Sequence, residues 1–162
     1  MSKKERFIDN QDGTMTDSTT ELVWMQEDAW QKEAKWFTWD EAKELANHLN
    51  DNYLGTGFTS SGTTTGGPYN DIKLGGFQDW RLPTENEIQS LYHEKASNQD
   101  KYGKEIHLWS AFPSGGLATV WLQGESGHEG TLFDFKNGEF RPLFKSKSGR
   151  MTGRLVRGEM LK

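Results

Sequence analysis

The hydrophobic pattern begins with short strands. Residues 7–8 are apolar and lead to the tight-turn dipeptide Asp12-Gly13, and residues 14–16 then alternate polar and apolar positions. A polar turn over residues 17–20 precedes the apolar run at 22–24. This pattern predicts a three-stranded meander at the start of the chain.

Two capping boxes predict two helices. Thr38 is followed three positions later by Glu41, and apolar residues then recur at helical spacing up to position 49. Thr84 and Glu87 repeat the arrangement after Pro83, with an apolar stripe at positions 88, 91 and 92. The stretch before the first helix has no clean period, so we expect a loop with one helical turn at 26–37.

The second half of the chain changes to strand-like runs at 118–122, 131–135 and 154–157, and Asn137-Gly138 is a hairpin signal. Leading strands, two main helices and trailing strands predict an α+β fold with short antiparallel sheets. Residues 55–71 start with a Gly/Ser/Thr-rich tract, which predicts a loop insertion that is either a flexible spacer or an adaptable binding loop.

Composition adds an aromatic core to this picture. A length of 162 residues favours one domain over residues 1–162. Hydrophobic residues make up only 33% of the chain, but the 7 Trp, 9 Phe and 4 Tyr argue against disorder, because each aromatic side chain buries a large apolar area.

Charge is unevenly placed. The net charge is −5, yet residues 141–162 contain seven cationic residues and a single acidic one, Glu159. These cations either meet the chain's own carboxylates or form a basic patch for an acidic partner. An acidic chain without a nucleic-acid-binding motif makes DNA or RNA a poor candidate partner.

The chain has no cysteine, which excludes disulfides and thiol chemistry. The N-terminal residues lack the apolar stretch of a signal peptide, and no segment has the apolar length of a membrane span. We therefore expect a cytoplasmic or other non-secreted protein.

Four segments in a fixed order span nearly the whole chain: residues 6–14 (RFIDNQDGT), 39–42 (WDEA), 75–84 (GGFQDWRLPT) and 154–158 (RLVRG). Together they resemble the DUF1566 family, also described as the Lcl C-terminal domain. The resemblance implies a C-type-lectin-like fold, related to the formylglycine-generating enzymes and sulfatase-modifying factors. It also implies long loops and paired chain ends, with residues 7–8 beside residues 155–156.

The resemblance does not supply a ligand. The oxidase activity of the formylglycine-generating group depends on paired cysteines, so the absence of cysteine excludes it here. Family members usually carry a WSS-type motif in a late strand, whereas residues 120–123 (VWLQ) keep only the tryptophan. Some members resemble surface adhesins that bind glycosaminoglycans, and others are accessory domains.

Other candidate chemistry is better explained by structure. Residues 9–13 superficially suggest a calcium loop, but the first and twelfth ligand positions would fall on Ile8 and Thr19. The four histidines are spread along the sequence. Arg81 is expected to pair with Glu85 or a neighbouring carboxylate. We therefore expect no catalytic residue, no metal ligand and no cofactor.

The candidate site is a partner-binding surface built from the insertion, the loop aromatics and the basic C-terminal segment. Its members are Trp30, Trp36, Phe37, Phe58, Tyr69, Asn70, Asp71, Trp109, Phe112, Trp121, Lys145 and Arg150. Loop-like segments hold more aromatic residues than a small core easily absorbs, and exposed aromatic clusters mark interfaces.

Three functions follow from these observations. The first is a non-catalytic protein-interaction module, acting as an accessory or assembly subunit of a larger protein complex. The first alternative is a lectin-like receptor for a carbohydrate, glycosaminoglycan or other polyanion. The second alternative is a metal-dependent enzyme that uses the cleft of the fold.

Overall fold

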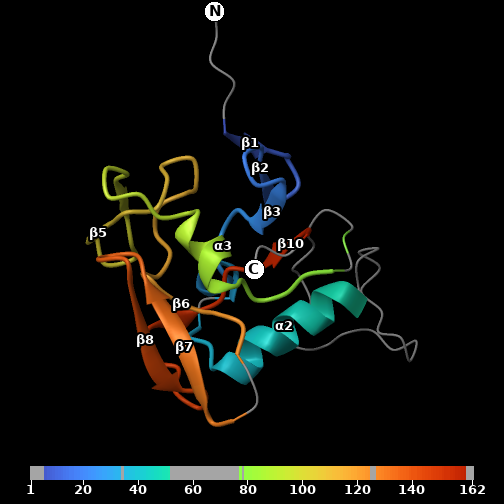
Figure 1. Ribbon diagram of the computed structural model, residues 1–162, viewed down its shortest axis with the longest axis vertical. Helices are drawn as coiled ribbons and strands as arrows, with labels where there is room; N and C mark the ends of the chain where they lie inside the picture. Colours follow the sequence, from blue (N-terminus) through green and yellow to red (C-terminus); the bar gives the residue numbers. More distant parts are fainter. Residues whose placement is uncertain (1–5, 34, 52–76, 78, 125–126, 160–162) are drawn as a thin grey trace, which may run out of the picture.

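The computed structural model describes residues 6–33, 35–51, 77, 79–124 and 127–159 (Figure 1). It confirms the α+β prediction and is consistent with the C-type-lectin-like fold that the resemblance implies. The insertion predicted at 55–71 lies outside the described residues.

The predicted meander forms the first sheet. It consists of β1 (Phe7–Asp9), β2 (Thr14–Asp17) and β3 (Leu22–Met25), and β3 pairs on its other side with β10 (Val156–Arg157). Asp12 closes the first turn by accepting the backbone N–H of Thr14 at 3.1 Å. This role as a turn residue is the one expected in place of a calcium ligand.

Strands from both ends of the chain share this sheet, but the expectation that residues 7–8 lie beside residues 155–156 is wrong. Val156 pairs with Trp24 of β3, and β2 and β3 separate it from Phe7. Two tight turns make β1, β2 and β3 consecutive neighbours, so β10 completes the outer edge of β3. This suits β3, which is buried along its whole length, whereas β1 exposes Ile8 and Asp9 at the opposite edge.

The second four-stranded sheet has the order β8-β7-β6-β9. Its members are β6 (Thr119–Trp121), β7 (Glu129–Asp134), β8 (Glu139–Phe144) and β9 (Met151–Thr152). The predicted hairpin joins β7 to β8, with Gly138 at a φ of 73°, where glycine avoids the strain of a side chain. A small sheet of β4 (Asn98–Gln99) and β5 (Glu105–Ile106) completes the strands of the described residues.

Both predicted capping boxes are present. They start α2 (Trp39–Asp51) and α3 (Glu85–Gln89), and the expected helical turn in the preceding loop is α1 (Ala29–Glu33). Glu41 accepts the Thr38 N–H at 2.9 Å and donates its own backbone N–H to the Thr38 hydroxyl at 3.1 Å. Helix α3 is shorter than the apolar stripe suggested, because Tyr92 leaves the helix to bridge Leu108.

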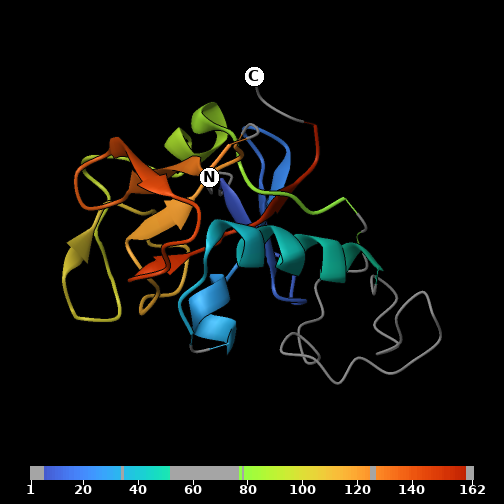
Figure 2. The same cartoon turned by 90° about the horizontal axis from the view of Figure 1, so that it is seen from below.

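Two hydrophobic clusters form the core. One lies under α2 and the other surrounds Trp24, α3 and the inner face of the second sheet. Figures 1 and 2 show α2 crossing the underside of the first sheet, and Figure 2 shows α1 beside the beginning of α2. Trp24, Trp39 and Trp80, which the sequence predicted as core, expose 0%, 9% and 3% of their surface.

Two buried charges join segments that are distant in sequence. Asp28 accepts the backbone N–H groups of Gln31 and Leu117, each at 2.8 Å. Arg154 donates to the carbonyl oxygens of Met25 at 2.8 Å and Gln26 at 2.7 Å. Burial raises the pKa of Asp28 above its ordinary value of 3.8, although the charge of Arg154 and the N–H donors oppose this.

Gly116 lies against the Asp28 carboxylate. A Cβ atom at this position would come within 2.4 Å of the Asp28 Oδ2 atom, whereas a Cβ at Gly149 would meet nothing within 4 Å. Any side chain at 116 therefore has to displace a carboxylate that two segments hold in place.

Gly116→Ala should lower the free energy of unfolding by about 2 kcal/mol, because overpacking is combined with loss of buried hydrogen bonds. The control Gly149→Ala should change it by less than about 0.5 kcal/mol. Urea unfolding measures both, and equal losses would contradict the contact at Gly116.

An ion pair ties the first sheet to the end of α3. Arg6 donates to the buried Asp17 carboxylate at 2.9 and 2.8 Å and to the carbonyl oxygen of Ser90 at 3.0 Å. Burial raises the pKa of Asp17, but hydrogen bonds from Arg6 and the Thr19 N–H, together with the Arg6 charge, outweigh burial. The net pKa lies below the ordinary value of 3.8.

Asp17→Asn should therefore reduce stability in a pH-dependent manner. A lowered folded pKa adds stability above pH 3.8 that is lost as the pH falls through the folded pKa. The difference in unfolding free energy between wild type and Asp17→Asn should be largest near neutral pH and shrink below pH 3.8. Urea titrations over this range measure it; a difference that does not change with pH would contradict the assignment.

Candidate functional site

Three aromatic residues of the predicted partner surface belong to the core instead. Phe37, Phe112 and Trp121 expose 0%, 1% and 0% of their surface, so their prediction as contact residues is wrong. The Trp121 indole N–H donates to the Phe37 carbonyl oxygen at 2.8 Å. Phe37 belongs to the cluster under α2 and Phe112 to the cluster around Trp24, so the loops that carry them supply side chains to the core.

The prediction of Lys145 as a contact residue is also wrong, since only 8% of its surface is exposed. Its alkyl chain runs beside Gly130 and its ammonium group lies 3.9 Å from the centre of the Trp39 ring. Trp109 is partly buried between Phe7 and His93, with ring centroids 5.8 and 5.2 Å away. Trp109 thus packs onto the second core cluster.

The basic C-terminal segment mostly meets the chain's own acceptors. Arg141 pairs with Asp134 at 2.8 Å and Arg157 with Asp79 at 2.9 Å, while Arg154 is buried. Arg150 is exposed, as the candidate surface requires. The predictions for Phe58, Tyr69, Asn70 and Asp71 concern positions outside the described residues.

The remaining candidates lie together on one exposed surface. Trp30 and Trp36 line a depression of about 300 Å³ with Lys35 and Lys101. The Lys101 ammonium group lies 4.3 Å from the centre of the Trp30 ring and 5.8 Å from that of Tyr102. The Arg150 guanidinium lies 5.2 Å from the Tyr102 ring.

We call Trp30, Trp36, Lys101, Tyr102 and Arg150 the aromatic–cationic surface. Trp36 and Tyr102 each expose 44% of their area, which is large for side chains of this size. Lys101 and Tyr102 are absent from the sequence-based list, because a lysine and a tyrosine in a polar turn carry no distinguishing signal. Only the fold brings them beside Trp30.

The buried Asp28 positions this surface. It precedes α1, which carries Trp30, and the Trp30 N–H donates to the Thr152 hydroxyl at 2.9 Å. Gly116, which lies against the Asp28 carboxylate, accepts the Lys101 N–H at 2.7 Å. The backbones of Trp30 and Lys101 are therefore both held by segments that lie against the buried Asp28 carboxylate.

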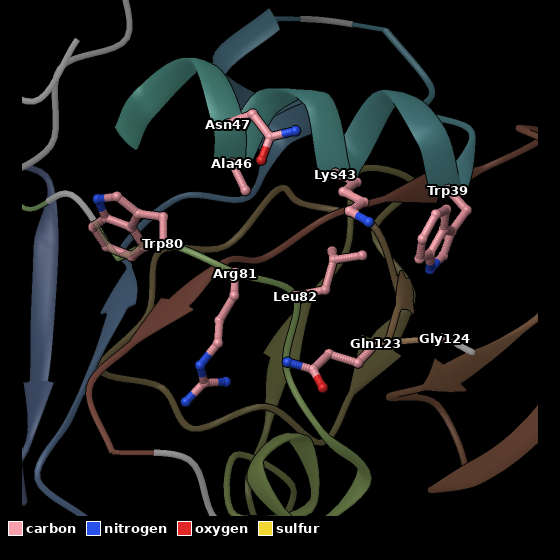
Figure 3. A pocket seen from close by; sticks show the side chains of 9 residues that line it. All are labelled: Trp39, Lys43, Ala46, Asn47, Trp80, Arg81, Leu82, Gln123 and Gly124. Atoms are coloured by element: carbon pink, nitrogen blue, oxygen red, sulfur yellow. The ribbon is translucent and has the colours of Figure 1, made fainter. Parts of the chain in front are cut away.

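A separate depression, the Trp39 pocket, has a volume of about 220 Å³ (Figure 3). Trp39, Lys43, Ala46 and Asn47 line it from α2, while residues 80–82 and 123–124 form the facing walls. The sequence pattern did not single out Lys43, Asn47 or Gln123, because each is a common exposed polar residue.

Arg81 takes part in a structural ion pair at the wall of this pocket. It donates to the two carboxylate oxygens of Glu87 at 2.6 and 2.7 Å and to the Gly158 carbonyl oxygen at 3.1 Å. The expectation that Arg81 pairs with a nearby carboxylate is confirmed, with Glu87 rather than Glu85 as the partner. Glu87 also completes the capping box of α3, which makes the turn into this helix rigid.

Among the described residues, no three His, Cys, Asp or Glu side chains converge as a group that could hold a metal ion. His107 lies 2.9 Å from the Ala96 carbonyl oxygen through its Nδ1 atom, and His93 Nδ1 accepts the Lys95 N–H at 3.0 Å. No described helix combines the length and apolarity required to cross a membrane.

Fold and site together define an α+β, C-type-lectin-like domain with an exposed aromatic–cationic surface and a small polar-rimmed pocket. The family model of the Lcl C-terminal domain matches residues 13–157, and the chain belongs to this family. No curated protein matches the sequence.

Buried and exposed tryptophans should differ in their contribution to the free energy of unfolding. Trp121→Ala should lower the unfolding free energy by about 4 kcal/mol, because it empties a core position. Trp36→Ala should change it by about 0.5 kcal/mol or less, because the side chain is exposed. Urea unfolding distinguishes them, and similar losses would contradict the assigned burial.

Proposed function

We propose that this domain is a non-catalytic protein-interaction module, an accessory or assembly subunit that binds its partner through the aromatic–cationic surface. The observation that carries the proposal is the grouping of Trp30, Trp36 and Tyr102 on one exposed face with cations stacked on two of these rings. Tyrosine, tryptophan and arginine are the residue types enriched in protein interfaces and their hot spots.

The surface is suited to an acidic partner. Lys101 and Arg150 are both exposed, and the contacts that the structure shows for their charged groups are with aromatic rings. A partner carboxylate can pair with them without first breaking an internal ion pair. The aromatic faces then supply apolar area that the partner removes from water.

The carboxylates whose pKa values are shifted support a binding role over a catalytic one. Asp17 pairs with Arg6, Asp28 accepts backbone N–H groups, and Glu41 caps α2 while pairing with Lys35 at 2.6 Å. Perturbed groups in enzymes commonly face a cleft and its substrate. Here these three stabilise turns and helix ends.

A polyanion receptor is the alternative that one further feature favours. Lys136, Arg141 and Arg150 line a depression of about 310 Å³ that Tyr102, Asp100 and Asp134 also line. Asp134 pairs with Arg141 at 2.8 Å, so the cations that favour a polyanion are Lys136, Arg150 and the neighbouring Lys101. Sulfated glycans bind such clusters through salt-sensitive contacts. The interaction proposal ranks first because the exposed Trp36 and the half-buried Trp30 extend the same surface.

The test is capture of a partner from the native organism by three proteins: wild type, a Trp36→Ala/Tyr102→Ala variant and a Phe144→Ala control. Phe144 is 57% exposed and lies outside the aromatic–cationic surface. Any captured chain is then purified and its affinity measured. The surface variant should bind it about 30-fold more weakly, since hot-spot truncation costs about 2 kcal/mol, and the control should bind as wild type.

Two results would count against the proposal. A lone monomer at micromolar concentration with no specific captured chain would remove most of its support. Retention on heparin at physiological salt that disappears in a Lys101→Gln/Arg150→Gln variant, without any protein partner, would favour the polyanion receptor instead.

A further inference from the structure

The Trp39 pocket combines an apolar floor with a polar rim. Ala46 and Leu82, 3% and 4% exposed, lie at its base, between the aromatic side chains of Trp39 and Trp80. Figure 3 shows Lys43 and Asn47 on the α2 side and Gln123 on the facing segment, with Leu82 between them. One ammonium group and two amides therefore border the same small volume.

The walls of the pocket are held in place by described contacts. The side chain of Asn50 accepts the Trp80 N–H at 2.7 Å and donates to the Trp80 carbonyl oxygen at 2.9 Å. The Gln123 N–H donates to the Pro83 carbonyl oxygen at 2.8 Å, and the Trp39 indole N–H to the Leu122 carbonyl oxygen at 3.0 Å. A preformed pocket loses little entropy when it binds a ligand.

The local charge is positive. None of the described residues that line the pocket is acidic, whereas Lys43 and Arg81 are cationic. Glu87 neutralises Arg81, but the contact that the structure shows for the Lys43 ammonium is the Trp39 ring, 5.2 Å away. Lys145 adds a second ammonium group 3.9 Å from the centre of this ring.

We propose that the Trp39 pocket binds a small carboxylic acid with an apolar body. Lys43 pairs with the carboxylate, the amides of Asn47 and Gln123 hydrogen-bond to its oxygens, and the apolar body rests on Ala46 and Leu82. The volume of about 220 Å³ lies below the ~300–1,000 Å³ usual for drug-sized ligands, which restricts the ligand to about one ring or one short chain.

This site is independent of the proposed partner surface. The residues that line the Trp39 pocket are not members of the aromatic–cationic surface. A Trp36→Ala/Tyr102→Ala variant should therefore bind the acid as wild type does. Failure of one proposal consequently leaves the other untouched.

The test uses phenylacetate, with neutral phenylacetamide as the matched probe, titrated into the ¹⁵N-labelled full chain and followed by NMR. Phenylacetate should shift the indole N–H signals of Trp39 and Trp80 with a dissociation constant in the millimolar range. Phenylacetamide should bind at least about tenfold more weakly, because it cannot form the charge-assisted pair with Lys43.

Lys43→Met keeps the alkyl chain on the Trp39 ring and removes the charge, so it should reduce phenylacetate affinity about tenfold while the fold persists. Lys104→Met, an exposed lysine outside the pocket, is the control and should bind normally. Gln123→Ala should produce a smaller loss of about threefold.

The proposal is overturned if phenylacetate causes no shift at 10 mM, if phenylacetamide binds equally well, or if Lys43→Met binds as wild type. A peptide acid, acetyl-Gly-Phe, distinguishes the source of the carboxylate. Binding of this peptide without binding of phenylacetate would replace the small-molecule site with a site for a protein C-terminus.

Discussion

The structure depends on two buried charges that are satisfied largely by backbone groups. Asp28 gathers N–H donors from Gln31 and Leu117, and Arg154 gathers carbonyl acceptors from Met25 and Gln26. Desolvating a charge is costly, so each must keep these partners. The loop that leads into α1, the segment before β6 and the chain before β10 are thereby held at fixed positions. Two members of the aromatic–cationic surface, Trp30 and Lys101, are attached to these segments.

The aromatic residues explain how a chain with 33% hydrophobic residues forms a core. Trp39 and Trp121 fill space and also donate indole N–H groups to the carbonyl oxygens of Leu122 and Phe37. Such a side chain stabilises a loop as well as the core, because it satisfies a backbone acceptor that the loop would otherwise leave buried. Irregular segments can consequently lie inside this domain.

The two proposed sites have different physical characters. The aromatic–cationic surface presents wide rings and exposed cations, which suit a protein partner with carboxylates. The Trp39 pocket is small and has rigid walls, which suits a single acid group with a short apolar body. The segment between Asp28 and Asn47 supplies residues to both sites. It starts at the buried Asp28 and includes α1 and most of α2. Because the two proposed sites share no residue, the proposals allow a partner and a small ligand to bind at the same time.

The sequence alone determined the local elements: the first meander, both capping boxes and the hairpin at Asn137-Gly138, since their signals lie within a few neighbouring residues. It also indicated the family and the core role of Trp24, Trp39 and Trp80. Tertiary structure decided which loop aromatics are exposed, because burial of Phe37, Phe112 and Trp121 depends on strands and loops distant in sequence. It likewise decided that β10 lies beside β3, and that Lys43 and Gln123 border one pocket.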